Sequence, residues 1–419
     1  MAVIQSYVSE PGKPLQTVPI ADNDNRPILA IVQAFDFREE EIPPRDWIVP
    51  GVLIRGHVSL LVAPPGAGKS LFTLQLTTAA ARGLAWGGFT PRDSYRALVI
   101  NSEDDVDEMR RRLAATLRMM DVSKSSVLDK VFLADRPDKI VVAKTDPKTK
   151  TVTRQPLVDE IIRLVVDNRI DVLVVDPFAE TFEGDENSNS EVKWAATFWR
   201  EVARKAHCSV FLVHHTSKAL SGAPGDMNAA RGGGSLVGVA RVMVTLFSMS
   251  EADAKAFGMS PDDRHRYVRF DDAKANLSLV TGAAKWFRKE TVRLNNATVD
   301  RPADEVGVFI PWTPQSLMDG ISTTTANAIL DEIAIGMLDN EGKPNGSRYC
   351  FTDTRRGARW AGHIIIKHHE MPVERATRIL KAWLEHDVIV ESDYHDPLQN
   401  KAKKGLRVVD TNRPDRLVD

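Results

Sequence analysis

Between residues 42 and 293 the chain alternates short runs of apolar residues with longer helix-like stretches. Each short run is almost continuous in Val, Leu and Ile, which is typical of a strand in a parallel sheet that is covered on both faces. The pattern therefore predicts a doubly wound α/β domain with a mostly parallel sheet. The predicted strands are 58–63, 96–101, 171–176, 209–214 and 242–247, and the predicted helices are 71–83, 106–120 and 157–168.

The segments on either side of this domain, which we place at 41–295, have other patterns. Residues 1–40 mix Pro, Asn, Asp and Gln with little periodicity, which predicts a disordered tail with at most one short helix. Residues 296–324 are irregular and polar, and we interpret them as a linker. In 325–419 three helical stretches precede two short strands around a lysine-rich loop, an order that predicts a small winged-helix-like α+β domain.

Composition adds limits on the class of protein. The chain is 43% hydrophobic and 27% charged with a net charge of -2, so any nucleic-acid partner must be met by a local patch. The two cysteines, Cys208 and Cys350, form no C-x-x-C pair, which argues against a zinc site or a disulfide framework. The apolar runs are too short to span a bilayer, and no signal peptide is recognisable. We expect a soluble cytoplasmic protein without a membrane partner.

The stretch LVAPPGAGKSLFTLQL, residues 61–76, places a Gly/Pro loop between a buried strand and a helix. The backbone N–H groups of such a loop, with the helix N-terminus, bind phosphates. Lys69 adds a positive charge and the Ser70 hydroxyl is suited to Mg²⁺. Ala63 stands where the motif usually has its first glycine. The candidate phosphate-binding residues are Pro65, Gly66, Ala67, Gly68, Lys69, Ser70 and Leu71.

Carboxylates follow two further predicted strands. Asp176 ends DVLVVD, where a parallel strand beside the P-loop can supply a second anchor for Mg²⁺; the alternative is a loop cap. Glu103 follows RALVINS and is the candidate that polarises an attacking water, with Asp104 as the fallback. The alternative is an acidic cluster at a helix N-terminus, which suits Asp105 and Asp107 better than Glu103.

Two histidines end the strand VFLVHH. Adjacent strand residues face opposite sides, so His214 and His215 do not bind one metal ion together. We favour His215 as the residue that senses the γ-phosphate, against the alternative of a buried structural histidine.

These motifs resemble those of the RecA-like P-loop ATPases, specifically the hexameric replicative helicases of the plasmid RepA type. The resemblance implies a RecA-like core, ATP and Mg²⁺ as cofactors, single-stranded DNA as a partner, and a ring, a hexamer, that holds each nucleotide between neighbours. A replication initiator or a primase is a further partner that fits such a motor. The matching stretches are PPRDWIVPGVLIRGHVSLLVAPPGAGKS, INSEDD, VVDPF, LVHHTSK, AARGGGSLVGVAR and RFDDAKANL.

The same resemblance implies roles for individual residues. Arg231 falls at the position of an arginine finger that reaches the neighbouring subunit's nucleotide, and Lys274 falls near a second cationic position there. Three glycines follow Arg231, where many relatives carry Gly-Ser-Ser, and we interpret them as a hinge. The remaining implied roles are phosphate and Mg²⁺ binding by Lys69 and Ser70, Mg²⁺ binding by Asp176, water activation by Glu103 and γ-phosphate sensing by His215.

DNA contacts are predicted in two places. RATRILKAW sets Arg375, Arg378 and Lys381 on one helical face, and QNKAKKGLR, with Lys403 and Lys404, would be a basic wing. A solvated face or a protein-binding winged helix is the alternative. In the core, the loops 183–191 and 217–228 are candidates to line a channel, with Lys218 as a phosphate contact. The first loop is acidic and would need basic neighbours, which the sequence does not place.

Two other functions remain open from the sequence. One is a RecA-like repair or recombination accessory that assembles on DNA without unwinding it. The other is a regulator whose winged helix binds a DNA site under the control of ATP.

Overall fold

The computed structural model describes residues 37–134, 140–216, 224–226, 233–257, 259–260, 262–275, 277, 284–314, 317–352 and 357–414. The chain divides into one unit of residues 1–46 and a second of residues 47–419. In the first unit, the described part contains a single turn of 3-10 helix, Glu39–Glu41. The predicted tail therefore lies almost entirely outside the described residues.

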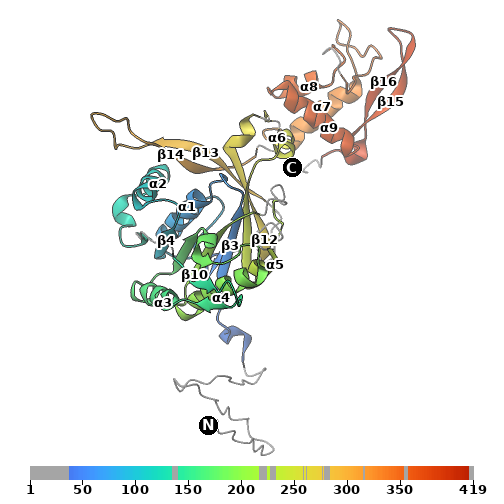
Figure 1. Ribbon diagram of the computed structural model, residues 1–419. Coiled ribbons are helices and arrows are strands. Elements are labelled where there is room, and N and C mark those ends of the chain that lie inside the picture. Colours follow the sequence, from blue (N-terminus) through green and yellow to red (C-terminus); the bar gives the residue numbers. More distant parts are fainter. Residues whose placement is uncertain are drawn as a thin grey trace, which may run out of the picture. The chain divides into compact units, whose positions relative to one another are not determined.

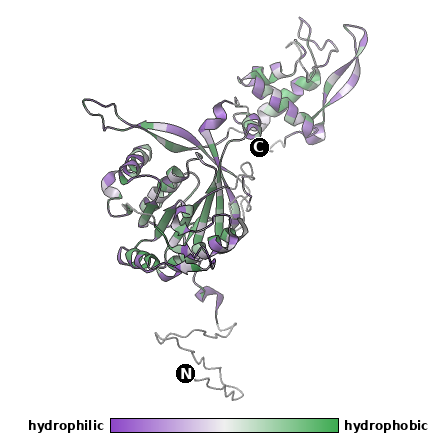
Figure 2. Cartoon of the chain, in the orientation of Figure 1, coloured by the Kyte–Doolittle hydropathy of each residue, from purple (hydrophilic) through white to green (hydrophobic). Residues whose placement is uncertain are grey.

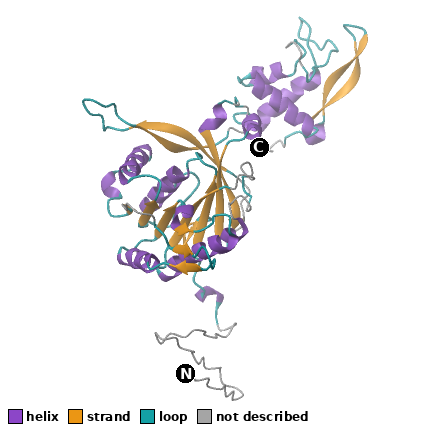
Figure 3. Cartoon of the chain, viewed as in Figure 1, coloured by secondary structure: helices purple, strands orange, loops and turns teal. Residues whose placement is uncertain are grey.

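A nine-stranded sheet forms the centre of the second unit (Figures 1 and 3). Its order is β14-β13-β12-β11-β3-β10-β8-β4-β5. The strands from β11 to β5 pair in parallel, and β12, β13 and β14 continue the sheet in antiparallel fashion. This confirms the predicted α/β fold with a mostly parallel sheet. The strands are β3 (Val58–Ala63), β4 (Ala97–Asn101), β5 (Val131–Leu133), β8 (Val172–Asp176), β10 (Ser209–His215), β11 (Val242–Ser248), β12 (Tyr267–Ala275), β13 (Lys285–Arg293) and β14 (Glu305–Trp312).

Helices cover both faces of this sheet, as Figure 2 shows by its green strands between amphipathic helices. Successive residues of β3 face opposite sides, so Leu60 joins a core with Trp199, whereas Leu61 joins another core with Phe72. Both cores are built from buried side chains, with a few partly buried ones packed against them. The helices are α1 (Lys69–Arg82), α2 (Val106–Met119), α3 (Leu157–Asp167), α4 (Asn189–Lys205), α5 (Gly233–Val239) and α6 (Glu251–Phe257).

Short strands complete this part of the fold. β1 (Trp47–Val49) pairs with β2 (Leu53–Ile54) in an antiparallel hairpin. A separate three-stranded sheet has the order β7-β6-β9, with β6 (Ala143–Thr145), β7 (Val152–Arg154) and β9 (Phe182–Glu183). The sequence analysis predicted neither of these small sheets, because strands of two or three residues carry almost no periodicity.

The β13–β14 ribbon is the main departure from the predicted organisation. The segment 296–324 was interpreted as a linker, but β14 lies within it and pairs with β13 from Trp286↔Trp312 to Arg293↔Glu305. The strand signal is an alternation over 305–308, in which Val306 and Val308 are buried while Glu305 and Gly307 are exposed. Because the interpretation rested on the polar residues before this alternation, it extended the linker too far.

The ribbon is fastened to α1 by one buried side chain. Gln75 donates from Nε2 to the carbonyl oxygen of Phe309 at 3.0 Å and accepts from the Phe309 N–H at 2.8 Å. Replacing Gln75 by Leu leaves both backbone groups buried without partners. We expect this variant to lose about 2–4 kcal/mol of unfolding free energy in urea denaturation, whereas Gln75→Glu should lose less only at low pH, where the protonated carboxyl can donate to the Phe309 carbonyl oxygen and accept from the Phe309 N–H. Equal stability of Gln75→Leu and the natural protein would contradict this role.

The C-terminal part has its own hydrophobic core, formed by residues such as Ile329, Ile364, Leu380 and Trp383. Three helices come first, α7 (Thr323–Ile335), α8 (Gly362–His368) and α9 (Val373–Glu385). An antiparallel hairpin of β15 (Ile389–Asp396) and β16 (Lys401–Val408) follows them. The observed order of helices and strands is the predicted one.

Candidate functional site

The P-loop joins β3 to α1, and two glycines give it its shape. Gly66 and Gly68 have φ angles of 74° and 94°, in the left-handed region that favours glycine. A Cβ at Gly68 would also lie 2.5 Å from the Phe309 ring of β14. The α1 helix begins at the next residue, Lys69, so its free N–H groups open onto the loop.

A cavity of about 690 Å³ lies over the P-loop. The P-loop residues from Pro65 to Leu71 form its floor, except that Ala67 is buried beneath it. The start of α2 forms one wall, His215 contributes from β10, and residues 304–307 of the β13–β14 ribbon form another wall. This volume falls within the range of small-molecule and cofactor sites.

Parallel register brings the predicted chemistry to one edge of the sheet. His215 pairs with Ala63 across β10 and β3, and Asn101 pairs with Asp176 across β4 and β8. Ligand sites in such sheets lie at the carboxyl ends of the strands. His214 points to the other side, where it is buried and packs edge-on against Phe178 at 5.6 Å. The predicted opposite orientation of the two histidines is thus observed.

Lys69, His215 and Glu103 form a short polar chain across the cavity. The Lys69 Nζ lies 3.2 Å from the Nδ1 of His215, and the His215 Nε2 lies 3.8 Å from Glu103 Oε1. An ammonium group can only donate, so Nδ1 of His215 accepts and the ring proton resides on Nε2, facing Glu103. Burial lowers the pKa of Lys69, while the charges of Asp176 and Glu103 oppose that shift.

Asp176 is a buried carboxylate that faces the Ser70 hydroxyl, and within the described residues its oxygens make no further hydrogen bond. Burial raises its pKa to about 6, with the Ser70 hydroxyl opposing the shift and the charge of Glu103 adding to it. A buried carboxylate beside a hydroxyl fits a divalent cation that prefers oxygen ligands. The described residues contain no group of three or more His, Cys, Asp and Glu placed to hold a metal. Mg²⁺ would thus bind here to Asp176 and Ser70 together with nucleotide phosphates.

The raised pKa of Asp176 leads to a stability prediction. Its value of about 6 lies above the ordinary 3.8, so the metal-free protein is stabilised at low pH and loses that stability as the pH rises through 6. At pH 7.5 in EDTA, we expect the unfolding free energy of Asp176→Asn to exceed that of the natural chain by an amount on the order of 2–3 kcal/mol. The variant should therefore unfold at a higher temperature. The difference should vanish near pH 4. A variant that is less stable than the natural chain at pH 7.5 would contradict this account.

The acidic cluster after β4 separates into distinct roles. Asp104 forms a two-pronged ion pair with Arg112, at 2.7 and 3.1 Å. Asp105 is the N-cap of α2 and accepts from Glu108 N at 2.7 Å, which confirms its predicted place at a helix N-terminus. Asn101 fixes the turn by accepting from the N–H groups of Glu103 and Asp104. Glu103 is the carboxylate of this cluster whose side chain faces His215 across the cavity and stays half exposed.

The predicted interface residues are only partly described. Arg231 and Lys218 lie outside the described residues, as do most positions of the loop 217–228. Lys274 donates from Nζ to the carbonyl oxygens of Val237 at 2.5 Å and Ala240 at 2.9 Å, at the C-terminal end of α5. A cation at that position interacts favourably with the helix dipole. Within its own chain Lys274 therefore anchors the helix that follows the Arg231 segment.

Two of the predicted nucleic-acid contacts in the C-terminal domain have internal partners. Arg375 donates from Nε to Leu317 O at 3.2 Å and also to the Asp319 carbonyl. Lys403 pairs at 2.6 Å with the buried Asp396, whose carboxylate also accepts from backbone N–H groups after β15. These two residues hold the domain together.

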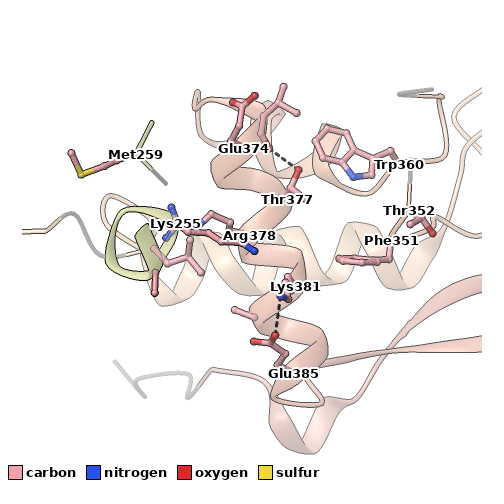
Figure 4. Close-up of a pocket in the computed structure, with 14 residues that line it drawn as sticks. Lys255, Met259, Phe351, Thr352, Trp360, Glu374, Thr377, Arg378, Lys381 and Glu385 are labelled. Atoms are coloured by element: carbon pink, nitrogen blue, oxygen red, sulfur yellow. Dashed lines mark hydrogen bonds and ion pairs between the residues drawn. The ribbon is translucent and has the colours of Figure 1, made fainter. Parts of the chain in front are cut away.

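Of the other three predicted contacts, Lys381 and Lys404 are exposed and Arg378 is partly buried. Figure 4 shows Arg378 and Lys381 along α9, with Lys381 paired to Glu385 at 3.5 Å. Burial, with the nearby charge of Arg375, lowers the pKa of Arg378. Lys404 is exposed on β16. A basic surface thus exists here, but it is smaller than the sequence predicted.

The sequence analysis missed the residues that the ribbon brings to the cavity. Arg111 of α2 pairs with Asp304 at 3.0 Å, next to the cavity wall formed by residues 304–307. Lys289 of β13 donates to the carbonyl oxygen of Gly66 in the P-loop at 3.4 Å, and burial lowers its pKa. The alternation around Val306 and Val308 was the available signal for this ribbon.

The fold and the site together have the features of a P-loop nucleotide-binding domain, with a mostly parallel sheet covered by helices and a glycine-containing loop between β3 and α1. Residues 25–221, which carry the P-loop, Asp176 and His215, match the sequence profile of a family described as AAA domain. The chain is also similar to the crystal structure of a KaiC-like protein from the hyperthermophilic archaeon Pyrococcus horikoshii OT3. That similarity has 14% identity and a TM-score of 0.37, and covers 57% of this chain and 89% of the other. Among the described helices, none has the length and apolar character needed to cross a membrane.

Proposed function

We propose that the protein is an ATP-hydrolysing DNA motor that assembles into a ring, a hexamer, and acts as a replicative DNA helicase of a plasmid, phage or mobile element. The observation that carries the proposal is the half-exposed Glu103, which faces the P-loop cavity next to His215. A carboxylate at that position suits hydrolysis, because it can take a proton from an attacking water. The resemblance to the RepA-type helicases supports the DNA-directed part.

In this proposal the chain's own groups each have one task. The N–H groups of the P-loop and α1 bind phosphate oxygens, and Lys69 leaves His215 to contact the same phosphates. Ser70 and Asp176 hold Mg²⁺, which neutralises phosphate charge when bound. Glu103 accepts the water proton. When Lys69 moves to the phosphate, the Nδ1 of His215 loses its contact with the Lys69 ammonium group. The other nitrogen of the same imidazole ring faces Glu103, so His215 would link phosphate binding to Glu103.

The charges around the cavity support a cation from a second subunit. Arg112 is held by Asp104, and Arg111 is held by Asp304 and Glu108. Lys69, which lies in the floor of the cavity, is therefore the cation that is placed to contact a phosphate. A transferring phosphoryl group develops negative charge that calls for a further cation, and Arg231 is proposed to supply this cation between subunits.

ATP turnover measured with and without DNA tests this function. We expect single-stranded DNA to raise turnover several-fold and Lys69→Ala to abolish turnover in both conditions. The C-terminal basic surface, with Arg378, Lys381 and Lys404, would add phosphate contacts. Turnover that ignores single-stranded DNA, together with sequence-preferring binding of duplex at physiological salt, would contradict the motor and favour the ATP-controlled regulator.

A further inference from the structure

The acidic connection before α4 has basic neighbours that lie far away in the sequence. β6 pairs in parallel with β9, and this sets Lys144 opposite Glu183, with an ion pair of 2.8 Å between them. The β6–β7 hairpin thereby lies beside residues 183–191. The sequence carries the acidic stretch and the lysine-rich hairpin about 40 residues apart, and the three-stranded sheet joins them.

Glu191 fixes this arrangement. Its carboxylate is buried and accepts from Asp185 N at 2.9 Å. Burial alone would raise the pKa of Glu191, but the Asp185 N–H and the hydroxyls of Thr145 and Ser188 hold it below its usual value. The most buried acid of the stretch thus has a structural task, and it ties the start of α4 to the hairpin.

The tip of the hairpin presents lysines. The Asp146 carboxylate accepts from the N–H groups of Lys148 and Thr149, both at 2.8 Å, so the acid at the tip is used by the turn itself. Lys148 and Lys150 are exposed on either side of that turn. The surface carries charges of both signs, since Asp185 and Glu186 are near in sequence to Glu191. Its lysines suit contacts with a few phosphates.

Trp194 stands on α4, three residues after Glu191. Its side chain is 52% exposed, whereas six other tryptophans of the described residues are below 9%. The ring lies 6.3 Å from that of Phe198, which supports it from below. Exposed Lys193 precedes it, and the partly exposed Arg200 and the exposed Arg204 lie on the face of α4 that Lys193 occupies, next to the face of Trp194. An indole held on a helix among cations matches the stacking platforms of single-strand binders.

We propose that Lys148, Lys150, Lys193 and Trp194 form a contact surface for single-stranded nucleic acid on the ATPase core. This inference rests on the proposed function and names where the strand is held. The lysines contact the sugar-phosphate backbone and the indole stacks on an unpaired base, which duplex DNA does not offer. The requirement for basic neighbours around residues 183–191 is met by the β6–β7 hairpin.

Binding of a fluorescent oligothymidylate to the full chain with a non-hydrolysable ATP analogue tests the surface. Trp194→Ala should weaken the affinity about 10-fold, and Trp194→Phe should restore most of it, because an aromatic face remains. The matched control removes one exposed lysine and one exposed apolar side chain elsewhere, as Lys124→Ala with Leu128→Ala, and should change the affinity less than twofold. Melting temperatures within 2–3 °C of the natural chain, roughly the shift that 1 kcal/mol causes in a large domain, establish folding.

The salt dependence of binding tests whether the two hairpin lysines contact the sugar-phosphate backbone. Lys148→Ala with Lys150→Ala should lower the slope of log affinity against log salt by about 1.4, since each phosphate contact on a single strand contributes about 0.7. An unchanged slope together with an unchanged Trp194→Ala affinity, in a protein that binds the oligonucleotide, would overturn the surface and leave the motor intact. A natural chain that binds no single strand would overturn the motor itself. Mass photometry shows whether Trp194→Ala still assembles into the oligomer. Loss of the oligomer would assign the indole to a subunit interface and would also overturn the surface.

Discussion

Glu103→Gln is expected to lower the turnover number for ATP by 10²–10⁴, the usual contribution of a general base, with nucleotide affinity changed less than a few-fold. Gln keeps the size and polarity of the side chain, so the loss reports the missing proton acceptor. Single-turnover hydrolysis and the binding of a fluorescent ATP analogue measure the two quantities separately.

Asp104→Asn is the matched control for this prediction. It is the adjacent carboxylate, of similar chemistry, but it is bound to Arg112 at 2.7 Å. Its loss should affect the position of α2 and lower turnover less than 10-fold, since the residue has a structural partner. If Asp104→Asn abolished turnover while Glu103→Gln retained it, Asp104 would be the base and the assignment of Glu103 would be wrong.

Arg231→Ala carries the second large expected effect. An arginine finger contributes 10³–10⁵ to turnover, so the variant should be almost inactive while it binds ATP with nearly the natural affinity. Because the finger would act on the neighbour's nucleotide, a mixture of Arg231→Ala and Lys69→Ala chains should regain activity. In that mixture, an intact P-loop of the first variant meets an intact Arg231 of the second.

Arg241→Ala provides the control at the other end of the same motif. Arg241 is exposed directly before β11, and its loss should change turnover less than threefold. Two results would contradict a finger that acts between subunits. One is a loss of ATP affinity in Arg231→Ala, which would place the side chain in its own pocket. The other is a mixture that stays inactive although the two variants assemble together.

The central strands were predictable because each is an almost continuous apolar run of the length of one strand. β3 occupies the predicted positions 58–63, and β8 and β10 differ from the predicted bounds by a single residue at one end. The P-loop, Asp176 and His215 were then found at the ends of these strands, where a parallel sheet gathers its ligand residues. For these strands, the local sequence pattern and the sheet topology predict the same position for the site.

Other features depend on partners far away in the chain, which a local pattern cannot report. The β13–β14 ribbon was partly assigned to a linker because its alternation follows a polar turn. Arg375 and Lys403 look like DNA contacts on a helical face or in a wing, yet each is engaged by the domain itself. The burial of Asp176 and the pairing of Asp104 with Arg112 also depend on tertiary contacts. That pairing is what distinguishes Glu103 from Asp104.

Strand displacement is the most direct test of the central claim that ATP hydrolysis at this cavity drives a DNA motor. The substrate is a forked duplex with one labelled strand, incubated with Mg²⁺-ATP and the natural chain, Glu103→Gln or Asp104→Asn. The account predicts that the natural chain releases the strand, that Glu103→Gln releases none while still binding the fork, and that Asp104→Asn retains activity. ATP turnover that is stimulated by single-stranded DNA without any release of the strand would contradict the helicase.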